Sequence, residues 1–101
     1  ETGYHPGARW CEVRDAEGHG LRIEARGELG VSLLPYSSAQ IEQAAHWWEM
    51  PAPELRAATY LRLLTAQMGV GGDDSWGSPV HDEFHVDASG TQVLDVTLSL
   101  I

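Results

Sequence analysis

Lysine is absent from this 101-residue chain, and cysteine occurs once, at Cys11. Six arginines face fifteen acidic residues, giving a formal net charge of −9 at pH 7. Nucleic acids and anionic membranes bind clustered cations, so this charge argues against both as partners. No apolar run approaches the roughly 18 residues of a membrane span, and no signal peptide is visible. One cysteine excludes an intrachain disulfide and a multi-cysteine zinc site, and it is compatible with a reducing compartment.

The chain is long enough for one small domain, and we take residues 1–101 as a single domain or fragment. Apolar and polar residues alternate with a period of two, which is typical of strands with one wet face. This alternation predicts strands at 9–15, 21–26, 31–34, 80–86 and 94–100. Gly27 and Gly30 separate the second strand from the third. The pattern indicates a mainly β, antiparallel fold without a βαβ rhythm.

One short helix interrupts this pattern. Ser37 and Gln40 have the spacing of a capping box, in which each side chain satisfies a backbone N–H of the first helical turn. The apolar stripe behind them has helical spacing and consists of Ile41, Ala44, Ala45 and Trp48. Pro51 and Pro53 then end the helix.

Residues 55–68 can be read in two ways. Tyr60, Leu64 and Met68 belong to a helical stripe, and Gly69 has the place of a helix-terminating glycine. The same three side chains would also share one face of a strand. The pattern by itself favours the helix.

Two histidines, His81 and His85, are four residues apart. On a helix they would lie about 6 Å apart and could share a zinc ion. On a strand the same spacing covers about 13 Å, which is too far for one ion. The flanking alternation favours the strand, so we expect two solvated histidines and no metal site.

No residue in the chain is assigned a catalytic role by its pattern. Asp73 and Asp74 follow two glycines, and we expect them to form a turn in which a carboxylate accepts from nearby backbone N–H groups. Cys11 lies within a predicted strand, where it reads as a small core residue rather than a nucleophile. The carboxylates are many, but spacing singles out no acid and nucleophile pair.

Trp76 is the most informative residue, because a large aromatic side chain in a glycine-rich loop has little core to join. One interpretation is an indole folded back on a sheet edge. The other is an exposed platform, since a flat apolar ring can pack against the C–H face of a sugar. Trp47 and Trp48 adjoin the end of the predicted helix, and we expect Trp48 in the core.

Three segments resemble the C-terminal part of large bacterial β-galactosidases of glycoside hydrolase family 2. The most specific matches that family's motif at nine consecutive positions, Met68-Gly69-Val70-Gly71-Gly72-Asp73-Asp74-Ser75-Trp76. The others are Pro35-Tyr36-Ser37, with a helix containing His46 behind it, and Glu1-Thr2-Gly3, with Arg9-Trp10 following. Thr2 and His5 depart from the usual Asn and Arg. The resemblance covers essentially the whole chain.

The resemblance implies the C-terminal part of the small-chain domain, an antiparallel β-sandwich fragment of the galactose-mutarotase-like supersandwich type. It turns residues 60–67 from helix to strand. It also implies a cytoplasmic protein with an accessory role in hydrolysis of terminal β-D-galactosides such as lactose, because the family's two catalytic glutamates lie in a TIM barrel outside this chain.

By position, the resemblance implies that Trp76 stacks on the leaving-group sugar and that Glu1 lies near the same pocket. The family's Mg and Na belong to its catalytic domain, so no cofactor is expected here. The implied partners are the TIM barrel, a galactoside or acceptor sugar, and further copies in a homo-oligomer. The alternative is a stand-alone carbohydrate-binding or structural β-module.

Overall fold

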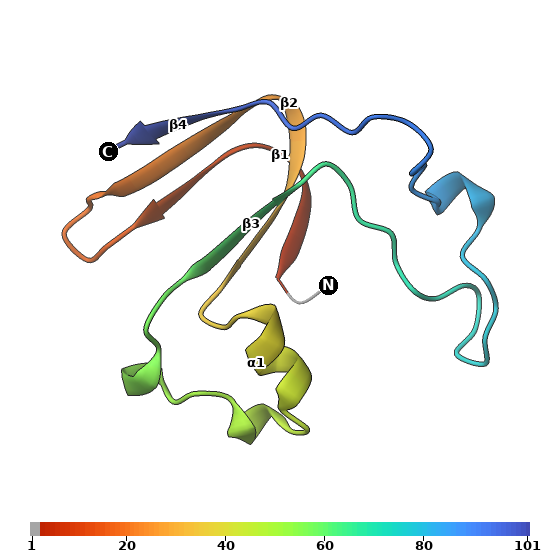
Figure 1. Ribbon diagram of the computed structural model, residues 1–101, viewed down its shortest axis with the longest axis horizontal. Helices are drawn as coiled ribbons and strands as arrows, with labels where there is room; N and C mark the ends of the chain where they lie inside the picture. The colour runs from red at the N-terminus through yellow and green to blue at the C-terminus, as the bar shows by residue number, and fades with distance from the viewer. Residues whose placement is uncertain (1–2) are drawn as a thin grey trace.

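The computed structural model describes residues 3–101 and contains one four-stranded antiparallel sheet built around a long central strand (Figure 1). Strand β1 (Tyr4–Arg14) turns through a short hairpin into β2 (Gly20–Leu34) and pairs along one edge of it. The other edge of β2 is shared end to end by β3 (Tyr60–Leu64) and β4 (Val96–Leu100). Within the described residues this confirms the mainly β, antiparallel fold with one short helix, as expected of a β-sandwich fragment.

Strand β2 is continuous where the sequence predicts two strands, 21–26 and 31–34. Gly27, with φ +114°, takes a conformation open mainly to glycine, and residues 25–28 bulge out opposite Arg9 alone. Gly30 lies so close to the Tyr4 ring that a Cβ atom would overlap it. The two glycines therefore bend a single strand and let β1 approach it, and the predicted break was wrong.

Helix α1 (Ser38–Gln43) begins as the capping box predicts. The Ser37 hydroxyl accepts from the Gln40 backbone N–H at 3.1 Å, and the Gln40 side-chain oxygen accepts from the Ser37 N–H at 2.8 Å. The helix ends at Gln43, so Ala45 and Trp48 of the expected stripe lie beyond it. Two 3-10 turns follow, Trp47–Glu49 and Pro53–Leu55.

Two predicted segments, 60–67 and 80–86, differ in whether a neighbouring strand pairs with them. Residues 60–64 form β3, so the strand implied by the resemblance is confirmed there and the helix favoured by the pattern was wrong. Leu61 and Leu63 pair with Leu33 and Val31 of β2, which supplies hydrogen bonds and apolar contacts that an isolated helix would lack. The predicted strand at 80–86 was also wrong: its centre is the 3-10 turn η3, Asp82–Phe84.

The core is small for a chain of this size. Ile23, Leu29 and Val31 are the buried apolar residues, and Ser32 is the buried polar one. The accessible surface is 7830 Å², whereas a compact protein of 11.0 kDa would expose about 5,600 Å². The radius of gyration is 16.4 Å, against about 13 Å for a compact chain of 100 residues. The molecule is thus a flat sheet with extended connections.

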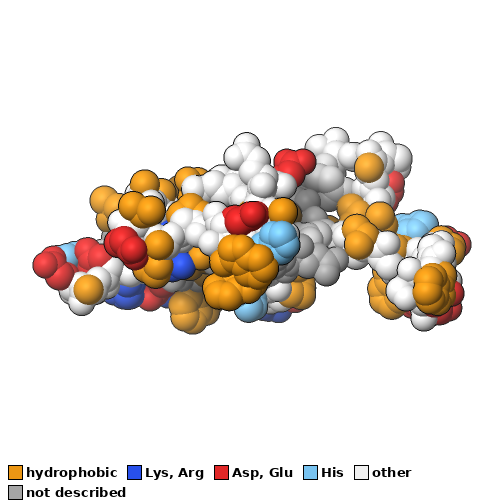
Figure 2. Space-filling model, turned by 90° about the horizontal axis from the view of Figure 1, so that it is seen from below, with side chains coloured by type: hydrophobic (Ala, Val, Ile, Leu, Met, Phe, Trp, Pro, Cys, Tyr) orange, Lys and Arg blue, Asp and Glu red, His pale blue; other side chains and the backbone are white. Residues whose placement is uncertain are grey.

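One face of the sheet is apolar and open. The register puts Val13, Leu21 and Leu100 side by side on this face, and Leu33 and Leu61 line the same hollow of about 650 Å³. Leu98 and Leu100 are 59% and 91% exposed. Figure 2 views the molecule edge-on and shows several separate groups of apolar side chains at its surface. Among the described residues, no helix is long and apolar enough to span a membrane.

Candidate functional site

Trp76 projects from the loop that follows β3, and its side chain is 92% exposed. The interpretation of an indole folded back on a sheet edge is therefore wrong. The loop extends away from the sheet in Figure 1, so the ring meets solvent on nearly all sides.

The backbone at Trp76 is held by the carboxylate of Asp74. One oxygen, Oδ1, accepts from the Trp76 N–H at 2.8 Å and from the Ser78 N–H at 3.3 Å. These hydrogen bonds, that from Trp76 first, hold the pKa of Asp74 below its ordinary value because they stabilise the ionised form. Asp74 thus shapes the loop as the sequence predicts, and it stays charged to lower pH.

The two ends of the loop meet below Trp76. The Nε2 atom of His81 lies 2.8 Å from Oδ1 of Asp73. Gly72 packs directly against the backbone carbonyl groups of Ser78 and Pro79, so close that a Cβ atom would overlap both. Only a glycine lets the two segments approach in this way.

This contact gives a prediction with a matched control. We expect Gly72→Ala to push residues 78–79 away and disturb the Trp76 loop, whereas Gly71→Ala should not, because nothing lies within 4 Å of a Cβ there. Backbone amide shifts of Trp76 and Ser78 measure the change. Overpacking of this kind costs about 1–3 kcal/mol. Equal shifts in the two variants would show that the close approach is unimportant.

His81 and His85 flank η3, so the expected strand geometry, with its separation of about 13 Å, does not apply. His81 contacts Asp73, and the Nε2 atom of His85 lies 3.0 Å from the Val80 carbonyl oxygen. Within residues 3–101, neither histidine belongs to a group of three side chains whose ligand atoms could meet at one ion.

A group that the sequence analysis missed lies in the turn between β1 and β2. Ligand atoms of Asp15, Glu17 and His19 lie within 4.8 Å of one another, and all three residues are exposed. Oδ1 of Asp15 already accepts from the backbone N–H groups of Glu17 and His19, at 2.9 and 3.0 Å. The alternation of acidic residues and histidine in a turn was the available signal. The Asp15 carboxylate here closes the turn.

Two further tryptophans lie on the surface beside α1. Trp47 is 81% exposed and Trp48 is 62% exposed, so the expectation that Trp48 joins the core was wrong. The Trp48 ring stacks on His46, with ring centres 4.3 Å apart and planes inclined by 12°. The early end of α1 at Gln43 explains the change, because Trp48 no longer shares a helical face with Ile41.

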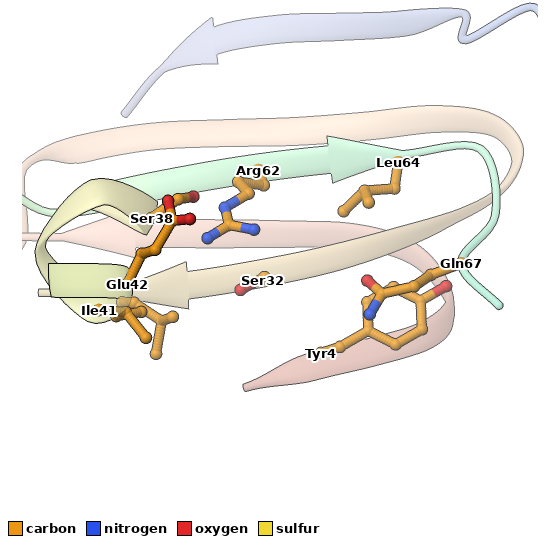
Figure 3. A pocket seen from close by; sticks show the side chains of 9 residues that line it. Tyr4, Ser32, Ser38, Ile41, Glu42, Arg62, Leu64 and Gln67 are labelled. Carbon is orange, nitrogen blue, oxygen red and sulfur yellow. The ribbon is translucent and has the colours of Figure 1, made fainter. Parts of the chain in front are cut away.

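A polar hollow of about 310 Å³ lies between α1 and the sheet (Figure 3). Arg62 of β3 and Glu42 of α1 both point into it, and Leu64 adds an apolar wall. Among the described residues, Arg62 is the one arginine that makes no ion pair, hydrogen bond or ring contact. Within residues 3–101, neither Arg62 nor Glu42 makes an ion pair, so the hollow offers a cation and a carboxylate to a ligand.

Two residues considered in the sequence analysis, Glu1 and Cys11, remain to be placed. Glu1, the second expected substrate-binding residue, lies outside the described residues. Cys11 is half-buried on the apolar face of β1, where burial raises the pKa of its thiol. A raised thiol pKa lowers the thiolate fraction at neutral pH, which agrees with a packing role rather than a nucleophile.

The fold and the loop together define an incomplete β-sheet module that carries an exposed aromatic platform on a tied loop. Residues 1–98 match the family model described as the β-galactosidase small chain, and the chain belongs to that family. No solved structure matches it.

Curated relatives agree with this assignment. A β-galactosidase, BgaC, of Bifidobacterium adolescentis is 49% identical over 104 residues, covering 99% of this chain and 10% of that protein. A β-galactosidase of Lactobacillus delbrueckii subsp. bulgaricus is 46% identical over 99 residues, covering 97% and 9%. A β-galactosidase small subunit of Latilactobacillus sakei is 43% identical over 68 residues, covering 67% and 20%. The chain thus spans about a tenth of the length of the first relatives.

Proposed function

We propose that the chain is an accessory part of a β-galactosidase, in which Trp76 forms a stacking platform for the sugar on the leaving-group side of the active site. The observation that carries this proposal is the 92% exposure of an indole whose loop backbone is fixed by Asp74. A ring held at the tip of a tied loop is available for C–H contacts with a sugar without rearrangement of the loop. The two catalytic glutamates belong to another part of the whole protein, the proposed TIM barrel.

The open apolar face supports the same proposal for the partner. Leu98 and Leu100 are exposed beside the hollow that Val13, Leu21 and Leu61 line. Exposed apolar area of this kind marks a protein interface. We propose that the remaining β-sandwich layers of the small-chain domain cover it, within a cytoplasmic homo-oligomer of the supersandwich type, and that Mg and Na, where present, bind in the catalytic domain.

This division of labour predicts that the 101-residue chain does not hydrolyse a chromogenic β-galactoside. The reaction needs a pair of carboxyl groups about 5–9.5 Å apart across the glycosidic bond, and none is proposed here. The measurement is release of the chromophore by the purified chain, with the whole enzyme as the positive control. Turnover that follows the chain through successive purification steps would contradict the proposal.

The second candidate function is a stand-alone carbohydrate-binding module, and the hollow of Figure 3 favours it. A sugar hydroxyl both accepts and donates, so neighbouring hydroxyls could accept from Arg62 and donate to Glu42. The native gene separates the two candidates. A reading frame that continues upstream of Glu1 into a barrel supports the enzyme, and a start codon immediately before Glu1 supports the module.

A further inference from the structure

A side-chain contact between Asp73 and His81, which are eight residues apart in the sequence, closes the loop that presents Trp76. An ionised carboxylate can only accept a hydrogen bond. The Nε2–H group of His81 is therefore the donor, and Oδ1 of Asp73 accepts at 2.8 Å. The two aspartates of the motif therefore have separate tasks. Asp74 fixes the backbone at the tip of the loop, and Asp73 holds the two ends of the loop together.

The two ends of the loop need such a contact because few other interactions hold them together. The loop contains Gly71, Gly72 and Gly77, and Gly77 has φ +109°. Glycines leave the backbone many alternative conformations. Below Trp76, the loop ends are held together by the Gly72 approach and by the Asp73–His81 hydrogen bond. Loss of the Asp73–His81 hydrogen bond would let the tip of the loop move as a unit, even while the turn closed by Asp74 stays intact.

We propose that His81 is a positioning residue for Trp76: by holding Asp73 it sets where the indole meets the sugar. This inference rests on the proposed function of Trp76. His81 touches no reacting group, and it acts only through the loop. Its side chain and that of Asp73 are 53% and 80% exposed, so the contact adds little to overall stability and its effect falls on loop position.

The test uses the whole enzyme that contains this chain. We expect His81→Ala to raise the KM for lactose about two- to fivefold, the range that one exposed polar pair supplies, with kcat unchanged. Asp73→Ala should do the same, and the double variant should be no worse than either single one. His81→Gln should restore the KM, because its amide N–H can also donate to Asp73.

A second comparison isolates the route through Trp76. In a Trp76→Ala background, His81→Ala should change nothing further, because the ring it positions is gone. His19→Ala is the matched control, since His19 is an exposed histidine in the turn between β1 and β2, which Figure 1 shows far from the loop that follows β3. It should leave the KM unchanged in either background.

The outcomes separate this inference from the proposed function. If Trp76→Ala has no kinetic effect, the proposed function fails, and this inference with it. If Trp76→Ala raises the KM but His81→Ala does not, only this inference is overturned. It is also overturned if His81→Ala raises the KM equally in the Trp76→Ala background, or if it lowers the melting temperature while the KM stays the same.

Discussion

Trp76→Ala in the whole enzyme is expected to raise the KM for lactose and to weaken binding of glucose as acceptor by about 5–30-fold. The reason is the loss of the proposed stacking surface, which would contribute roughly 1–2 kcal/mol of contact with a sugar. Folding should be nearly unaffected, because the side chain is 92% exposed and supports no core. The measurement pairs lactose kinetics with thermal unfolding of the same variant.

Trp47→Ala is the matched control for this prediction. Trp47 is also an exposed indole, at 81%, but it lies in the 3-10 turn after α1 rather than in the motif loop. It should leave the kinetics unchanged. Unchanged kinetics for Trp76→Ala with a large fall in melting temperature would mean that Trp76 is a structural plug, and the stacking role would have to be withdrawn.

Ile23→Ala is expected to have the largest effect on stability, lowering the free energy of unfolding by about 2–5 kcal/mol. Ile23 has no exposed surface and lies at the centre of the sheet, paired with Cys11 of β1 and with Leu98 of β4. Its truncation leaves a cavity where three strands meet. Few other buried side chains are present to compensate, since the core of the described residues is so small.

Urea unfolding of the 101-residue chain measures this change, and Leu100→Ala is the control. Leu100 lies on the same apolar face but is 91% exposed, so its loss should change stability by no more than about 0.5 kcal/mol. Equal losses for the two variants would mean that another copy covers the open face of the isolated chain in solution.

Strand alternation predicted the second half of β1, part of β2 and β4, because side chains of a half-buried strand must alternate between core and water. It did not predict that β1 begins as early as Tyr4. The capping box likewise placed the start of α1 correctly, since its two hydrogen bonds are made within four residues. The lack of apolar neighbours around Trp76 was compatible with an exposed ring, although the sequence left a ring folded back on a sheet edge open as well. Where strand alternation and the capping box predicted correctly, local chemistry was enough to determine the structure.

Residues 80–86 also alternate, except at Asp82, yet their centre is the 3-10 turn η3, and no strand pairs with them in the described structure. Residues 60–64 fit a helical stripe, yet they form β3 because β2 presents an open edge and apolar partners at that point. The Asp73–His81 contact also depended on how the loop folds back. A sequence specifies which residues alternate, cap or turn, but a strand exists only where a second strand supplies its hydrogen bonds. That pairing is decided by the tertiary structure.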